Sequence, residues 1–285
     1  MNEPKPAAFR GGKLDFATLA GLLVAVLGIV GGLLLEGGKV SDVSQFTAAM
    51  IVLGGTIGAV MVTTPLPLLA AAVKKLPLVF RDSTASPSEA IAQILRFAKD
   101  ARRNGLVSIE KEVEKIADPF LKKALSLAVD GTDIKELRSI MELEIGVAEH
   151  RGEAEAKVFE AAGGYAPTIG IIGAVLGLIQ VMKHLEDIEA VGHGIAVAFV
   201  ATVYGVALAN VICLPAANKL KLRLQESIQL KQMMLEGVVA IAEGLNPKLI
   251  QSKLEAYQAP EGPSDAKHED RRAVPRRAEA ARAHG

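Results

Sequence analysis

The sequence has 285 residues, 50% of them hydrophobic, and its 32 basic side chains balance 32 acidic ones. A net charge of zero argues against a nucleic-acid partner, and a single cysteine, Cys213, excludes a disulfide framework. The charges occur in blocks separated by long uncharged stretches, which is typical of a membrane protein and not of a soluble domain.

Four stretches contain no Asp, Glu, Lys or Arg: residues 16–35, 43–73, 161–182 and 190–218. A helix needs about 20 apolar residues to cross a bilayer, so each stretch predicts a membrane span. The first exceeds the apolar region of a signal peptide, about 7–15 residues, and no A-x-A cleavage site follows it. We interpret it as a retained span.

Lysine and arginine side chains gather on one side of these spans, which predicts the orientation. They precede the first span and follow the second and fourth, at Arg10, Lys13, Lys74, Lys75, Arg81, Lys219, Lys221 and Arg223. The connections 36–42 and 183–189 carry one lysine each and are otherwise acidic. We therefore expect both termini on the cytoplasmic side of the bacterial inner membrane.

The predicted fold is all-α, with four transmembrane helices and a helical cytoplasmic domain between spans two and three. The expected divisions are a cytoplasmic N-terminus (1–15), spans one and two (16–73), the cytoplasmic helical domain (74–160), spans three and four (161–218), a second cytoplasmic helical region (219–257) and a disordered tail (258–285). The tail is rich in Pro, Ala and Arg and has few large apolar residues. Its arginines suit an ordinary solvated tail better than binding to lipid headgroups.

Helix signals divide the cytoplasmic domain further. Ser86 to Glu89 has the spacing of a capping box with proline at the first helical position, and this helix should end at Asn104-Gly105. A second helix should run from about Ser108 to before Asp118, and a third from Pro119 to Gly131. Asp133 with Glu136 then opens a long helix towards span three. The region 219–257 should be helical with an interruption at 244–247.

No enzymatic motif is present in the sequence. It has no phosphate-binding G-x-x-x-x-G-K-[ST] loop, no Ser/His/Asp constellation and no clustered metal ligands. We therefore expect no enzyme activity, no cofactor and no metal.

Small residues recur at helical spacing in three of the spans. They are Gly170, Gly173 and Gly177 in span three, Gly54 and Gly58 in span two, and Gly205 with Ala209 in span four. Such residues let helix backbones approach closely in lipid. Tight static packing is the ordinary explanation, and a helix that slides or rotates is the alternative.

Two prolines and one threonine also lie in spans three and four. Pro167 and Pro215 each sit near the cytoplasmic end of a span, where proline removes a backbone hydrogen bond and can kink a helix. Separately they suit a first turn and a simple kink; as a pair they favour a hinge at the inner mouth of a conduit. Thr202 either bonds to its own helix or lines a narrow water path.

Several segments in order resemble the MotA family of flagellar stator subunits. They read ARRNGLVSIE at 101–110, AVDG at 128–131, YAPTIGIIGAVLGL at 165–178, AFVATVYG at 198–205, PAANKL at 215–220 and MLEGV at 234–238. The resemblance runs from about residue 15 to 257. Each segment is modestly specific, but their order on this topology is highly specific.

The resemblance implies a ring of MotA-like subunits around a single-span, MotB-like partner whose aspartate takes up the ion. It implies that Pro167, Pro215 and Thr202 match the family's functional prolines and pore-lining threonine. It also implies that Arg102 and Glu110 contact the rotor protein FliG, although their positions at helix ends also suit the helix dipole. Ala174, where sodium-driven relatives tend to carry threonine, favours protons.

Three other functions remain possible from the sequence. The nearest is an energiser of the ExbB or TolQ type, which four spans and the segment 102–110 argue against. A secondary carrier with its own substrate site usually shows internal repeats and polar midplane groups, and neither is visible. A passive membrane scaffold would not need the paired prolines.

Overall fold

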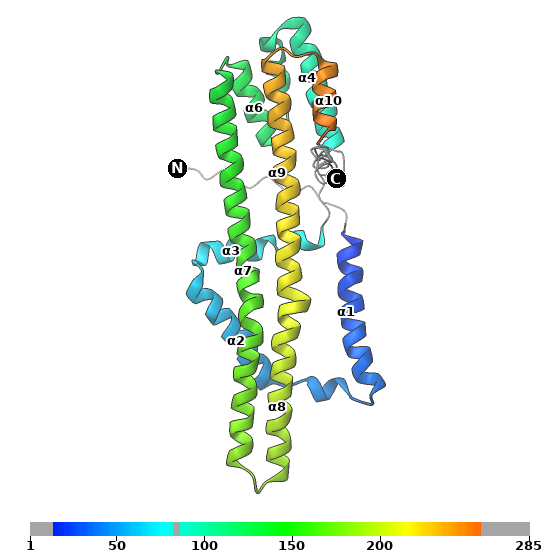
Figure 1. The fold of residues 1–285 in the computed structure, drawn as a ribbon, viewed down its shortest axis with the longest axis vertical. Coiled ribbons are helices and arrows are strands. Elements are labelled where there is room, and N and C mark those ends of the chain that lie inside the picture. The colour runs from blue at the N-terminus through cyan, green and yellow to red at the C-terminus, as the bar shows by residue number, and fades with distance from the viewer. Residues whose placement is uncertain (1–13, 82–85, 258–285) are drawn as a thin grey trace, which may run out of the picture.

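The computed structural model describes residues 14–81 and 86–257, which form helices joined by short connections (Figure 1). No strand occurs in these two ranges, and one isolated antiparallel bridge joins Leu14 to Arg81. The predicted all-α class is confirmed. The predicted tail at 258–285 and the residues before Leu14 lie outside the described part of the chain.

Four helical stretches of the described residues are long and apolar enough to cross a membrane, as predicted. They are α1 (Phe16–Leu35), α2 (Phe46–Thr63), α7 (Ile134–Lys183) and the continuous stretch Ile188–Ala242, which comprises α8 (Ile188–Ala207), the π-helical segment η4 (Leu208–Cys213) and α9 (Leu214–Ala242). The 3-10 helix η1 (Val40–Val43) connects α1 to α2.

The uncharged stretch 43–73, expected to be one span, is divided at Pro65. Helix α2 ends at Thr63, the backbone is extended at Thr64, and a separate helix α3 (Leu66–Lys75) follows. Proline disfavours the helical conformation for the residue before it, so Pro65 ends α2. The 3-10 helix η2 (Leu76–Phe80) then continues the chain from α3.

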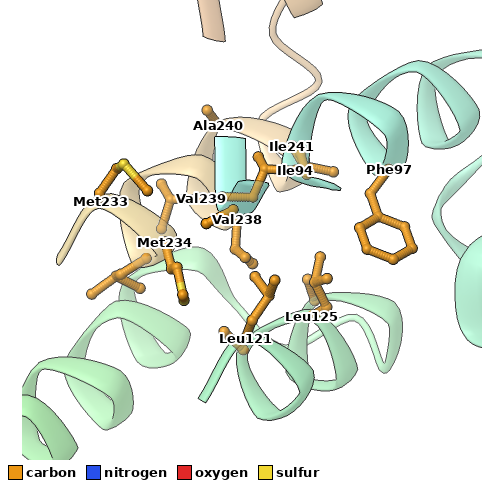
Figure 2. Close-up of a cluster of buried hydrophobic side chains, with 14 of the residues drawn as sticks. Ile94, Phe97, Leu121, Leu125, Met233, Met234, Val238, Val239, Ala240 and Ile241 are labelled. Atoms are coloured by element: carbon orange, nitrogen blue, oxygen red, sulfur yellow. The ribbon is translucent and has the colours of Figure 1, made fainter. Parts of the chain in front are cut away.

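A helical domain lies at the opposite end of the molecule from the α7–α8 turn (Figure 1). Its elements are α4 (Pro87–Asn104), η3 (Leu106–Ile109), α5 (Glu110–Val113), α6 (Pro119–Val129), the first turns of α7, the last turns of α9, and α10 (Pro247–Glu255). Figure 2 shows its core, where Phe97 of α4, Leu125 of α6 and Val238 of α9 converge. The segments 74–160 and 219–257 therefore share one hydrophobic core.

Most predicted helix ends in this domain are confirmed, but the helix expected from about Ser108 to before Asp118 is replaced by the 3-10 helix η3 and the single turn of α5, which ends at Val113. Helix α4 stops at Gly105, whose φ of 84° is the left-handed conformation that glycine adopts without strain. The Asp118 side chain caps α6 by accepting from the Leu121 N–H at 2.8 Å. The predicted capping box at Ser86 is wrong, because its hydroxyl lies 2.6 Å from that of Ser88 and caps no backbone N–H.

The predicted spans at 161–182 and 190–218 are parts of two much longer helical rods. Helix α7 has 50 residues, and the α8–η4–α9 rod has 55. Both rods run side by side from the α7–α8 turn into the helical domain (Figure 1). A movement of either span is thus connected directly to the domain core.

Candidate functional site: the α7–α8 helix pair

The backbones of α7 and α8 touch at glycine residues. A Cβ atom added at Gly170 would lie 2.8 Å from the carbonyl oxygen of Ala201, and one added at Gly205 would lie 2.5 Å from that of Ala166. Gly177 meets the carbonyl oxygen of Gly194 at 2.8 Å in the same way. These contacts confirm the close approach predicted for spans three and four.

The glycines predicted to pack in span two behave differently. No described atom lies within 4 Å of a Cβ added at Gly54 or Gly58, so neither glycine makes a close contact within the described chain. Gly55 instead faces Ile169 of α7, whose Cγ2 lies 2.7 Å from the added Cβ. The close packing predicted at Gly54 and Gly58 is therefore not formed within the described chain; the glycine of α2 that packs closely is their neighbour Gly55.

Thr202 and Ala174 lie on the paired helices and are both half-buried. The Thr202 hydroxyl donates a hydrogen bond to the carbonyl of Ala198, four residues earlier in the same helix, at 3.2 Å. This is the first of the two alternatives that the sequence offered for Thr202. The Cα of Thr202 lies 3.4 Å from the Cβ position at Gly170. This threonine is therefore one turn beyond Pro167 along the helix pair.

Neither Pro167 nor Pro215 ends the rod to which it belongs. In an α-helix a proline ring clashes with the carbonyl four residues earlier, and the wider π-helical turns of η4 directly before Pro215 relieve that clash. Pro167 leaves the carbonyl of Gly163 without its helical partner. A Cβ atom added at Gly163 would lie 2.7 Å from the Leu214 side chain, so this turn of α7 packs closely against the start of α9, next to Pro215.

The apolar parts of α7 and α8 present large hydrophobic side chains and no formal charge. Residues 161–182 and 190–218 contain no Asp, Glu, Lys or Arg, and no cluster of metal ligands occurs among residues 14–81 and 86–257. Large apolar side chains on both helices are exposed, including Ile171, Phe199 and Val203. A surface of this kind suits contact with further apolar helices or lipid and has no carboxylate to bind an ion.

Charged residues instead pair at the end of the apolar stretches that is nearer the helical domain. The Asp15 carboxylate, which caps α1, lies 2.6 Å from Lys219 and 3.1 Å from Arg223 of α9. The hydrogen bond from Lys219, followed by that from the Thr18 N–H, holds the pKa of Asp15 well below its usual range. Sequence reasoning missed this cluster, because only the fold brings Asp15 to residues more than 200 positions away.

A second ion pair is buried between α3 and α7. Glu155 of α7 is 2% exposed and pairs with Lys75, while the Arg151 guanidinium lies 3.4 Å from its other oxygen. In the sequence, this ion pair was indicated only by an acidic residue, Glu155, on an otherwise buried helix face. The pair fixes α3, which follows the break at Pro65, against the long rod.

Arg102 and Glu110 lie far from the α7–α8 pair, in the helical domain. Arg102 is in the last turn of α4, Glu110 begins α5, and both are exposed on either side of Gly105. Neither forms an ion pair with another residue of the described ranges. The structure therefore leaves both charges accessible to another molecule, in the helical domain that lies opposite the α7–α8 turn (Figure 1).

Comparisons with known proteins connect this architecture to one family. Residues 19–105 match the model described as Motility protein A N-terminal, and residues 112–233 match that of the MotA/TolQ/ExbB proton channel family. Motility protein A of Bacillus subtilis (strain 168) is 37% identical, with 86% of this chain and 91% of that protein covered. The Chemotaxis protein PomA of Vibrio alginolyticus is 33% identical over 86% and 95%.

Solved structures agree with the sequence relatives. The C. jejuni MotAB structure has a chain 34% identical to this one with a TM-score of 0.83, covering 88% of this chain and 98% of that one. The flagellar MotAB stator complex of Bacillus subtilis gives 36% identity and a TM-score of 0.80, over 86% and 96%. The chain therefore belongs to the MotA family of flagellar stator subunits.

Proposed function

We propose that this chain is the MotA subunit of a flagellar stator: with a single-span, MotB-like partner it forms an ion channel and converts ion flow into torque on the rotor. The observation that carries the proposal is that the closely packed apolar parts of α7 and α8, residues 161–182 and 190–207, contain no carboxylate. An ion-driven machine needs an ionisable group at membrane depth. The similar solved structures are those of MotAB and of a MotAB stator complex, and a MotB-like partner would supply the missing acid.

In this proposal several subunits form a ring around the partner, in the inner membrane, with both termini in the cytoplasm. The lysines and arginines at the inner ends of the spans support that orientation. Exposed apolar side chains on α7 and α8 would meet the partner helix and neighbouring subunits. Lipid would cover the other two spans, α1 and α2.

The proposed cycle depends on the cost of burying a charge. An ion that enters from the periplasm neutralises the partner carboxylate, and a neutral acid is far less costly than a charged one against the apolar faces of α7 and α8. Release past Pro167 and Pro215 restores the charge, and the ring moves to its next position. Each proton supplies about 2.3 kcal/mol per 100 mV.

Individual residues have distinct proposed roles. Pro167 and Pro215 gate the inner end of the path, and the Thr202 hydroxyl lines it. Ala174 offers no hydroxyl ligand for a dehydrated cation, which supports protons as the driving ion. Arg102 and Glu110 contact the rotor protein FliG, which their exposure at the far end of the helical domain supports.

The main rival is an energiser of the ExbB or TolQ type, since one matching model covers that wider family. The match of residues 19–105 to a Motility protein A model supports the stator function instead. Relatives of similar length that are named Motility protein A also support the stator function.

Motility tests the proposal directly. The chain and its partner are expressed in cells that lack stators, and swimming is recorded with either a proton or a sodium gradient alone. We expect swimming with the proton gradient, and none when the partner aspartate is replaced by asparagine. Purified chain in vesicles without the partner should leave a pH difference intact; rapid dissipation would contradict a partner-donated acid.

A further inference from the structure

The hydroxyl of Tyr204 connects α8 to the start of α2. It donates to the carbonyl of Val43 at 2.5 Å and is 3.4 Å from the Gln45 N–H, from which it accepts. Tyr204 also packs against the buried cluster that Ala48 and Val52 of α2 form with Val200 and Ala201 of α8. One side chain thus bridges two backbone groups that are 161 and 159 residues away in the sequence.

These backbone groups need a partner because of their position. Val43 ends η1, and Gln45 precedes α2 without capping it through its side chain. Tyr204 lies about 24 Å along α8 from Ile188, at 1.5 Å per residue. Figure 1 accordingly shows the α1–α2 connection well short of the α7–α8 turn. Backbone groups outside a helix have no helical partner, and where they are shielded from water they need another one, which Tyr204 supplies here.

The contact also fixes how α8 is rotated. Successive residues of an α-helix are about 100° apart, so Thr202, two positions before Tyr204, points to nearly the opposite side. While Tyr204 is bound to the η1–α2 junction, Thr202 faces away from α2. A phenylalanine at position 204 would keep the ring packing but lose both hydrogen bonds.

We propose that Tyr204 is a positioning residue: its hydroxyl sets the rotation of α8 and the height of α2 so that Thr202 keeps its place beside the ion path. This inference rests on the stator function proposed above. It assigns Tyr204 no contact with the ion. Its effect on torque passes through the orientation of α8.

The test compares Tyr204→Phe with Tyr165→Phe in the full complex with the partner. Tyr165, on α7, packs in an apolar cluster with Val60, Ala72 and Val158, and its hydroxyl forms no hydrogen bond with another described residue. Hydrogen–deuterium exchange of segment 41–48 reports on the bridge itself. The change in motor speed as single stator units join a motor reports on the torque of each unit, independently of how many units assemble.

We expect Tyr204→Phe to speed amide exchange in segment 41–48 at least tenfold and to lower the speed increment per unit at least twofold. Tyr165→Phe should change neither. Unchanged exchange would show that the bridge is not present, and an unchanged increment would overturn the positioning role. Failure of Tyr204→Phe alone to assemble would make its role structural and also overturn the proposal. If the unmodified chain gave no increments, the stator function would fail instead.

Discussion

Replacing Gly205 by alanine places a methyl group against the backbone of α7. Its Cβ would lie 2.5 Å from the Ala166 carbonyl oxygen and 3.1 Å from the Cα of Gly170, whereas ordinary contacts begin at 3.4 Å. The helices must separate by about 1 Å, which forfeits about a quarter to a half of the dispersion attraction between facing atoms. Overpacking costs about 1–3 kcal/mol, and the upper end applies because backbone cannot rotate away. Since alanine regains about 1 kcal/mol of helix propensity, we expect a net loss of about 2 kcal/mol.

Gly192→Ala is the matched control on the same helix, because no described atom lies within 4 Å of its added Cβ. The assay follows helix loss by circular dichroism on heating the purified complex; the chain has no tryptophan to report by fluorescence. At about 2–4 °C per kcal/mol, the midpoint of Gly205→Ala should fall by about 4–8 °C, and that of Gly192→Ala should stay or rise. Equal midpoints for the two variants would refute the backbone contact.

Three further substitutions probe the charged residues. Asp15→Asn removes the ion pairs with α9. Because the pKa of Asp15 is lowered in the folded protein, its carboxylate stabilises the fold fully above the pKa of the unfolded chain, about 3.9, and this stabilisation is lost as the pH falls further. Its melting midpoint should therefore lie below that of the parent by a constant amount from pH 8 to 5, with the gap closing below about pH 4. Lys75→Met leaves the buried Glu155 carboxylate without its main partner, so we expect a loss of about 3 kcal/mol in the same melting assay. Glu110→Lys should abolish swimming while membrane insertion, measured by fractionation, persists.

Two of these substitutions have a matched control in the chain. Arg151→Met removes the more exposed partner of Glu155, 74% exposed, and should cost much less than Lys75→Met; equal losses would contradict the burial argument. Glu89→Lys makes the same charge change as Glu110→Lys on an exposed site at the other end of α4, and swimming should survive it. Normal swimming with Glu110→Lys would remove the rotor contact. If the difference in melting midpoint between the parent and Asp15→Asn widened in acid, the sign of the Asp15 pKa shift would be contradicted.

Local signals in the sequence sufficed for the spans and for most helix ends. Uncharged stretches predicted the spans, and Asp118, Asp133 and Gly105 marked helix ends that the structure confirms. Such features depend on single side chains or on neighbours in sequence: the cost of charge in lipid, a cap within one turn, a glycine at positive φ. Pro167, Pro215 and Thr202 were singled out inside the uncharged stretches in the same way. Arg102, Glu110 and Ala174 came instead from the resemblance to the MotA family.

Hydrophobicity alone misplaced one boundary, because Pro65 is uncharged and the stretch around it stays apolar although the helix ends there. Ser86 shows the converse: its spacing from Glu89 suits a capping box, yet the hydroxyl lies next to another hydroxyl. A hydroxyl has several partners within reach, and the sequence does not rank them.

Tertiary structure decided the contacts between residues far apart in the chain. Asp15 meets α9, Tyr204 bridges to the η1–α2 junction, and Gly55, not Gly54 or Gly58, faces α7. Hydrogen bonds and ion pairs act over a few ångströms, so they exist only once the fold has placed both partners. The sequence alone determined which segments cross the membrane and that they carry no acid; the fold decided which faces of those segments meet.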